Sequence, residues 1–187
     1  EESGERGFSG VKSSLTKSLY EVKSVFLMRE KTVPADCTVL VVGGPTAGGS
    51  GERHTLVWVD RRGTQRPVDS AWTFRLGQQQ GNVGWALSPD GTRLAIGLET
   101  ESGDDIWIKQ LPAGPLSRMT FDTTDDSRPR WTPDGRSVMY IPRLPEVRRQ
   151  RSDGTGATEI VLKFTDPGTI NEALRSPDGR WLVFRRG

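Results

Sequence analysis

The sequence has few of the residues on which most catalytic and metal sites depend. Its 187 residues include one cysteine, Cys37, and one histidine, His54. A single cysteine excludes an intramolecular disulfide, and one His with one Cys cannot supply the four ligands of a zinc site. Only His54 could be the usual base of a Ser/His/Asp or Cys/His device, and no G-x-S-x-G sequence surrounds a serine. We therefore predict a protein that is not an enzyme, with no catalytic, cofactor-binding or metal-binding residue.

Long hydrophobic runs are also missing. No apolar run approaches the ~18 residues of a membrane-spanning helix, so we expect no membrane insertion. The chain begins Glu-Glu, without an initiator Met or a signal peptide. We interpret it as a fragment or processed product that lacks its targeting information, and its localisation is unknown from sequence.

The chain has little net charge overall, but its positive and negative residues are unevenly distributed along the sequence. The net charge is +2, whereas residues 127–151 carry seven arginines against two carboxylates, a net charge of +5. The arginines most suited to contact phosphates are Arg143, Arg148, Arg149 and Arg151. Single-stranded nucleic acid also needs aromatic side chains among the basic ones, and this stretch has none nearer than Tyr140. We interpret it as a solvated face and expect no nucleic-acid partner.

Glycine and proline, by contrast, are abundant, and they recur at a fixed interval. SPDG occupies Ser88–Gly91 and Ser176–Gly179, and TPDG occupies Thr132–Gly135, so the three starts are 44 residues apart. Pro fixes φ near −65° in a tight turn, Asp bonds to the local backbone, and Gly accepts a positive φ. Each tetrapeptide therefore predicts a hairpin reversal.

The residues after each turn keep the same register. Two sets of three are equivalent under a shift of 44: Leu94, Val138 and Leu182, and Ile96, Tyr140 and Phe184. All six are apolar with one intervening residue, which indicates one buried strand face. A 44-residue unit of four short strands is typical of a β-propeller blade. We predict repeat units at about 82–122, 128–164 and 170–187, with half a blade at 55–69.

Ahead of the repeats the pattern changes to α/β. Val11, Leu15 and Leu19 suit one face of a short helix, and residues 21–29 and 37–42 suit strands. We predict a partial α/β domain at 1–45, a Gly-rich linker at 46–54 and a propeller at 55–187. The fold class is thus mainly β, a partial, open β-propeller of about three four-stranded blades preceded by a short α/β segment. Closed propellers have four to eight blades.

Three sets of residues could carry chemistry, and each has a simpler structural explanation. The stretch from Gly43 to Ser50, GGPTAGGS, copies the skeleton of a phosphate-binding loop, but Gly49 stands where Lys is required. Carboxylates that could hold Ca²⁺ cluster at Glu99, Glu101, Asp104 and Asp105, and at Asp122, Asp125 and Asp126. No EF-hand or nonapeptide pattern surrounds them, and Asp105 is expected to fix a turn or strand entry. Trp58 and Trp107 stand within expected strands and are interpreted as blade core.

The segments DIWIKQL…SRMTFD…RPRWTPDGRSVMYI and RSPDGRWLVF resemble TolB-like, WD-type β-propeller repeats over residues 51–187. Such repeats occur in TolB, in extracytoplasmic sensor regions of bacterial serine/threonine kinases and beside prolyl-oligopeptidase-type catalytic domains. The resemblance implies a periplasmic or extracytoplasmic location and a protein or peptide partner. Trp131 is usual before the turn in these repeats, whereas Leu87 and Arg175 stand at the equivalent positions. Residues 78–80, three glutamines, lie in an insertion.

Residues 1–45 resemble instead a slice of the extracytoplasmic domain of gliding-motility-type ABC-transporter auxiliary proteins. The resemblance rests on the GE-containing loop, the expected helix and strand, and the VLVVGGP stretch that ends at Pro45. It implies no catalytic residue. Residues 1–45 and 51–187 are either a natural fusion or the product of a join near residues 42–51.

Three functions remain open from the sequence. The first is a noncatalytic protein-interaction or sensory propeller module of a larger bacterial protein. The second is an accessory propeller that gates a prolyl-oligopeptidase-type hydrolase absent from this chain. The third is a truncated or joined fragment without independent activity.

We predict that the purified chain self-associates or unfolds readily, because about three blades cannot close into a ring. Strands at an open end leave unpaired N–H and C=O groups that can pair with another copy. Light scattering and thermal melts test this expectation. A monomer with a sharp, cooperative transition at high temperature would contradict it.

Overall fold

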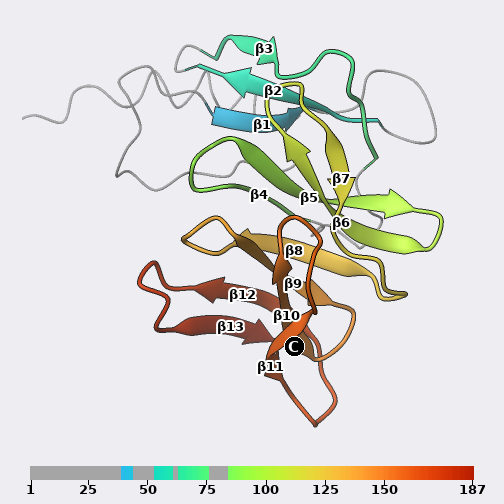
Figure 1. Ribbon diagram of the computed structural model, residues 1–187, viewed down its shortest axis with the longest axis vertical. Helices are drawn as coiled ribbons and strands as arrows, with labels where there is room; N and C mark the ends of the chain where they lie inside the picture. Colours follow the sequence, from blue (N-terminus) through green and yellow to red (C-terminus); the bar gives the residue numbers. More distant parts are fainter. Residues whose placement is uncertain (1–38, 44–52, 61–62, 76–83) are drawn as a thin grey trace, which may run out of the picture. The chain divides into compact units, whose positions relative to one another are not determined.

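The computed structural model describes residues 39–43, 53–60, 63–75 and 84–187 and divides the chain into two compact units, residues 1–74 and 75–187. Every regular element of the described residues is a β-strand (Figure 1). The chain is mainly β and forms a partial, open propeller rather than a closed ring. The helix predicted from Val11, Leu15 and Leu19, the strand at 21–29, Cys37, residues 48–50 and residues 78–80 lie outside the described residues.

The first unit contains one three-stranded antiparallel sheet. Its order is β1 (Val39–Gly43), β2 (Thr55–Val59) and β3 (Gln65–Pro67). Asp60 and Gly63 form the turn between β2 and β3: the Gly63 N–H donates to the Asp60 carbonyl at 2.9 Å, and Gly63 has φ +82°. The strand expected at 37–42 is therefore present in part as β1, and it pairs with β2 across the predicted linker. The domain limits at 45 and 55 stay predictions.

The second unit contains two four-stranded antiparallel sheets and a two-stranded one. The first is β4 (Trp85–Leu87), β5 (Arg93–Thr100), β6 (Gly103–Gln110) and β7 (Leu116–Arg118). The second is β8 (Asp126–Trp131), β9 (Ser137–Pro142), β10 (Glu146–Arg151) and β11 (Glu159–Lys163). The third pairs β12 (Ile170–Arg175) with β13 (Leu182–Arg186). In each sheet the strands are neighbours in chain order, as in a propeller blade.

The three recurring tetrapeptides fold into the same turn. The N–H of Gly91, Gly135 and Gly179 donates to the carbonyl three residues earlier at 2.8–2.9 Å, and each glycine has a positive φ between 66° and 72°. The Asp carboxylate of each turn accepts the hydroxyl of the first residue and the N–H two residues onward. These bonds lower the pKa of Asp90 to about 2, with the Ser88 hydroxyl as the largest cause. The predicted hairpin reversals are confirmed.

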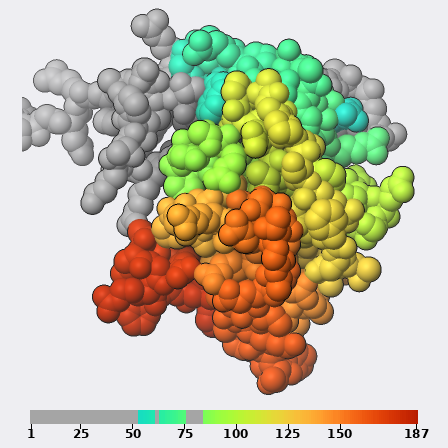
Figure 2. All heavy atoms as spheres, in the orientation of Figure 1, coloured from blue at the N-terminus to red at the C-terminus, as the bar shows by residue number. Residues whose placement is uncertain are grey.

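Strand β9 is buried on both faces because a sheet packs on each side of it. Val138 and Tyr140 lie in one cluster with Ala95, Ile106 and Ile108 of the preceding sheet and with Met119, which directly follows β7. Met139 and Ile141, which point to the opposite face, lie in a second cluster with Val147, Ile170 and Ala173. Figure 2 shows the orange residues of β8–β11 against both the yellow-green residues of the first sheet and the red residues of the last. The core thus consists of the seams between successive sheets.

The repeat predicts burial well for the first two units and poorly for the third. Leu94, Ile96, Val138 and Tyr140 are fully buried, as expected. Phe184 is 42% exposed, so the expectation of a buried residue there is wrong. Ile96 and Tyr140 lie on strands flanked by two neighbours, whereas β13 pairs with β12 alone among the described strands. Phe184 therefore keeps only part of the contacts of its equivalents, including the ring of Phe164 at 5.3 Å.

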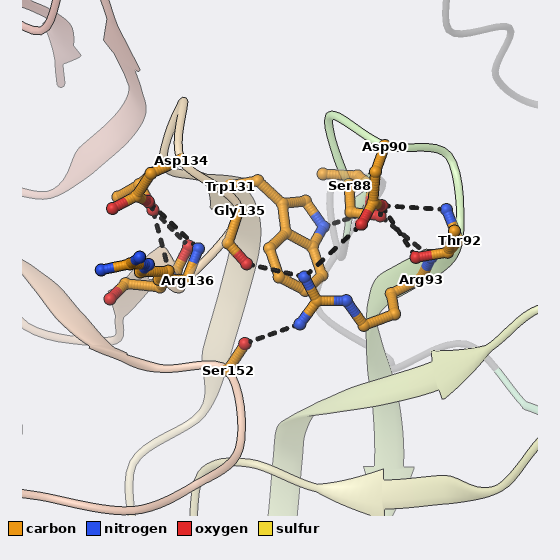
Figure 3. A network of polar contacts seen from close by, with 12 residues as sticks. Ser88, Asp90, Thr92, Arg93, Trp131, Asp134, Gly135, Arg136 and Ser152 are labelled. Atoms are coloured by element: carbon orange, nitrogen blue, oxygen red, sulfur yellow. Dashed lines mark hydrogen bonds and ion pairs between the residues drawn. The ribbon is translucent and has the colours of Figure 1, made fainter.

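Polar contacts also join the first two sheets of the second unit (Figure 3). The guanidinium of Arg93 lies 4.6 Å from the Trp131 ring centre and donates to the Gly135 carbonyl at 2.7 Å and the Ser152 hydroxyl at 3.0 Å. The Trp131 indole N–H donates to the Ala86 carbonyl at 2.8 Å. Arg93 and Trp131 thus fix the first sheet of this unit against the second at the end of the seam that carries the SPDG turns.

We predict that one substitution will have very different effects in two repeats. Val138→Ala removes methyl groups from a fully buried site and should lower the free energy of unfolding by about 2 kcal/mol. Val183→Ala, at a site that is 66% exposed, should change it by less than about 0.5 kcal/mol. Urea denaturation of the two variants measures both values, and equal losses would show that the seam is not the core.

Candidate interaction surface

The two acidic runs noted in the sequence meet at one end of the seam between β4–β7 and β8–β11. The connection from β7 to β8 brings Asp125 against the start of β6, where its Oδ1 accepts the backbone N–H of Asp104 at 3.1 Å. The hairpin turns β5–β6 and β9–β10 lie at this same end, because β6 begins there and Asp126 of β8 pairs with Pro142 of β9. The SPDG turns lie at the other end. We call this the loop end of the seam.

Asp105 is held by three groups of its own sheet and the following connection. Its Oδ2 lies 2.6 Å from the guanidinium of Arg118 and accepts the Thr100 hydroxyl at 3.1 Å. Its Oδ1 accepts the Thr120 hydroxyl at 3.3 Å, and Thr120 also accepts the Ile106 N–H. Asp105 therefore joins the β5–β6 hairpin to the chain leaving β7, which is the structural role expected from its place before Ile-Trp.

Arginines of the next sheet pair with two further carboxylates of the acidic runs and with Glu146. Arg148 of β10 pairs with Asp122 and, at 2.7 Å, with Glu146. Arg143 of the β9–β10 turn lies 3.3 Å from Asp125. These ion pairs connect the β7–β8 connection of one blade to the β9–β10 hairpin of the next.

Two large apolar side chains project from these connected loops. Phe121 is 64% exposed and Leu144 is 39% exposed. The guanidinium of Arg118, itself held by Asp105, lies 5.1 Å from the centre of the Phe121 ring. The loop end thus presents apolar groups on a backbone that ion pairs hold in place.

Asp126 is the one carboxyl of this region with an unsatisfied atom. It is fully buried, and its Oδ2 has no hydrogen-bond partner, while Oδ1 accepts the Thr124 hydroxyl at 3.3 Å. Burial is the largest effect and raises its pKa to about 7, and the nearby carboxylates Asp122 and Asp105 act in the same direction. The Thr120 hydroxyl and Arg148 oppose the rise. Asp126 therefore carries a proton through much of the range below neutral pH.

The other candidate residues have separate places. His54 forms an isolated bridge with Phe74, and the two rings stack at 6.2 Å. Trp58 and Trp107 lie within β2 and β6, as expected, and both are half-buried. Arg149 pairs with Glu159 of the neighbouring strand β11, and Arg151 pairs with Asp153 in the connection after β10. Glu99 and Glu101 stand at the β5–β6 turn, and Gly43 ends β1.

Metal and membrane sites find no support in the described parts of the chain. Within those ranges, no three His, Cys, Asp or Glu residues are grouped so that they could hold a metal ion. Nor do the described ranges contain an apolar helix of membrane-spanning length. The carboxylates of the loop end are instead engaged mainly with arginines and hydroxyls of the chain itself.

Sequence reasoning missed Arg118, Phe121 and Glu146 as members of this region. Arg118 and Phe121 stand in the stretch SRMTFD, and Glu146 stands in PEVRR. Local sequence does not show their role, because Asp105, the partner of Arg118, is 13 residues away and Asp122, the partner of Arg148, is 26 residues away. Only the register of neighbouring strands brings them together.

Comparisons with known proteins identify the fold. No family model matches the chain. A putative TolB from Agrobacterium tumefaciens superposes with a TM-score of 0.61 at 18% identity, covering 79% of this chain and 49% of that one. TolB from Acinetobacter baumannii gives a TM-score of 0.60 at 20% identity over 79% of this chain and 34% of that one. About four fifths of the chain therefore has a TolB-like propeller fold, since each superposition covers 79% of it.

A curated relative is similar over a shorter stretch. The uncharacterized peptidase YuxL of Bacillus subtilis is 32% identical over 104 residues, which is 51% of this chain and 16% of the relative. The chain spans half or less of the TolB structures and about a sixth of the curated relative. The activities of these larger proteins can therefore be assigned to this chain only as a proposal.

We predict that Asp126 makes the protein more stable in acid than at neutral pH. Its pKa is raised in the folded state, so the folded chain binds more protons than the unfolded chain between pH 3.8 and about 7, and stability falls as pH rises through that window. The loss corresponds to roughly 4 kcal/mol at most. Asp126→Asn should raise the free energy of unfolding at pH 8 and flatten its decline from pH 5 to 8.

The control is Asp90→Asn, which should leave that decline in place because Asp90 titrates near pH 2. A decline that Asp126→Asn leaves unchanged would contradict the assignment.

Proposed function

We propose that this chain is a noncatalytic recognition module of a larger bacterial protein, and that it binds a protein or peptide at the loop end of the seam. The observation that carries this proposal is the exposure of Phe121 and Leu144 on loops tied together by ion pairs. The TolB-like fold supports it, because propellers commonly present loops of one face to a ligand from a rigid scaffold.

The physical argument is one of preorganisation. Binding normally loses free energy when mobile side chains and loops become ordered. Here Asp122 and Asp125 fix the β7–β8 connection to Arg148 and Arg143 before any partner arrives. Aromatic residues and arginines are enriched in the central contacts of protein interfaces. The loop end has one of each in contact, since the guanidinium of Arg118 lies over the ring of Phe121.

A second function is favoured by one specific finding. The similarity to the peptidase YuxL covers half of this chain, so the propeller would be the accessory part that controls access to a prolyl-oligopeptidase-type hydrolase. In that case the serine nucleophile and its G-x-S-x-G sequence would belong to the parent protein, outside these residues. Serine-hydrolase labelling of the product of the complete reading frame with a fluorophosphonate probe separates this function from pure recognition.

The narrower resemblances belong to the same proposal. We place the propeller among WD-type sensor regions with an extracytoplasmic location, and residues 1–45 with the ABC-transporter auxiliary domain. What supports both is the similarity of sequence motifs described above. A chain in which residues 1–45 and 51–187 come from separate genes would be the alternative, and sequencing of the source DNA through residues 42–51 decides between them.

We predict that a photo-crosslinking residue at position 121 or 144 will capture a discrete partner in extracts of the source bacterium. The control is the same residue at Ala157, which is exposed in the connection at the opposite end of β10. Adducts identified by mass spectrometry should be shared by positions 121 and 144, absent at 157, and reduced when Arg148→Ala releases Asp122.

Two outcomes would overturn the proposal. Adducts that are equal at all three positions would show non-specific contact. No adduct at any position, together with no fluorophosphonate labelling of the full-length product, would favour a fragment without independent activity.

A further inference from the structure

Strand β13 is paired on one edge only among the described strands, with β12 as its neighbour. Its equivalents in the other two sheets of this unit are paired on both edges, since β5 lies between β4 and β6, and β9 lies between β8 and β10. A hairpin of two strands is only marginally stable by itself, and a further strand adds main-chain hydrogen bonds and apolar contacts. The β12–β13 sheet (Figure 1) therefore presents an edge at which each equivalent sheet has another strand.

The hydrogen bonds of the β12–β13 hairpin show which backbone groups face this edge. The Trp181 carbonyl accepts the Ser176 N–H at 2.8 Å, and Gly187 exchanges bonds of 3.0 and 3.1 Å with Thr169. Residues of an antiparallel strand alternate between bonding to one neighbour and facing the other side. Three residues of β13 therefore direct their N–H and C=O groups to the unpaired edge: Leu182, Phe184 and Arg186.

One face of the same sheet is apolar and exposed. Trp181 is 68% exposed, and Val183, which follows on the same face, is 66% exposed. Leu174 of β12 pairs in register with Val183 and is 45% exposed. In the middle repeat the equivalent of Val183 is Met139, which is buried in the seam with the following sheet. A strand added beside β13 would thus extend an apolar surface and cover part of it.

The unpaired charges of this sheet are positive. Arg180 and Arg185 are exposed, and neither side chain forms a hydrogen bond or ion pair with the described residues. Glu172, which pairs in register with Arg185, already forms an ion pair of 3.0 Å with β8. Asp178 accepts a hydroxyl within its own turn. An acidic strand beside β13 is therefore favoured electrostatically, whereas a second copy of β13 would bring like charges together across the edge.

We propose that the unpaired edge of β13 binds an extended segment of a partner protein by antiparallel pairing, and that this segment combines apolar residues with a net negative charge. In this mode of peptide recognition the main-chain hydrogen bonds supply affinity and the alternate side chains supply specificity. The edge contains no residue of the loop end, so the inference does not rest on the recognition function proposed there.

Strand β6 shows what such a segment looks like. It occupies the equivalent edge of β5 and has the sequence GDDIWIKQ, two aspartates followed by three apolar residues. Asp105 of β6 pairs with Leu98, whose equivalent under the repeat is Arg186. In the same register on β13, the acidic part of such a segment would lie at the end that carries Arg185 and Arg186.

The test is fluorescence anisotropy of the 187-residue chain with a dye-labelled peptide of the β6 sequence, GDDIWIKQ, at low salt. The chain should bind this peptide saturably. The same peptide with Asp104→Lys and Asp105→Lys should bind at least tenfold more weakly, because its charge is reversed. A version that is N-methylated throughout should not bind, because it cannot donate main-chain hydrogen bonds.

Variants of the chain locate the site. Arg185→Ala should weaken binding of the acidic peptide at least threefold. The matched control Arg136→Ala, which removes an exposed arginine from the TPDG turn, should change it less than twofold. Val183→Ala should also weaken binding while the melting temperature stays near that of the wild type, because the side chain is 66% exposed.

Several outcomes would overturn the inference. Equal binding of the lysine peptide would remove the selection for acidic segments, and equal binding of the N-methylated peptide would remove strand pairing. Equal effects of Arg185→Ala and Arg136→Ala would show that β13 is not the site. Sedimentation velocity at the assay concentration checks the competing occupant: a dimer that the acidic peptide does not dissociate would assign the edge to a second copy. Crosslinking at positions 121 and 144 tests the loop end separately, so either proposal can fail alone.

Discussion

The packing of one sheet against the next is the interaction on which the rest of the second unit depends. An isolated sheet of four short strands has no stable core of its own, and repeat proteins bury their apolar faces only against neighbouring repeats. Strand β9 shows this directly, since Val138 and Tyr140 pack toward the preceding sheet while Met139 and Ile141 pack toward the following one. Each apolar residue of the strand is assigned to one of two seams by the alternation of the pleat.

The turns make this alternation possible. A slip of one residue would exchange the two faces of a strand, and the SPDG and TPDG turns fix the register through the same set of hydrogen bonds each time. This is why the architecture could be predicted from sequence: the 44-residue interval, the turn chemistry and the apolar alternation are all local. The strands at 93–100, 103–110 and 137–142 follow from those signals.

The parts that could not be predicted depend on pairs distant in sequence. Nothing local shows that Asp104 and Asp125 meet, that Arg148 reaches Asp122, or that Asp126 is buried rather than exposed with its acidic neighbours. The acidic runs were recognised, but an acidic run suggests a metal site as readily as a set of ion pairs. Only the stacking of sheets decides between them, since it brings arginines of the following blade into the same place. Phe184 departs from its equivalents for the same reason, because burial is a property of the neighbouring sheet and not of the residue.

The repeat itself offers a way to separate structural residues from functional ones. Positions whose character recurs, such as Leu94 and Val138 or the turn glycines, satisfy the demands of every blade. Positions that differ need another explanation, and Trp131 has one: where the neighbouring repeats have Leu87 and Arg175, its indole N–H reaches Ala86 and its ring supports Arg93, so it fixes a particular seam. Arg128 differs from Gly84 at a backbone conformation that favours glycine, because both residues have a positive φ. A residue that opposes the local backbone preference is therefore not explained by the demands that every blade shares.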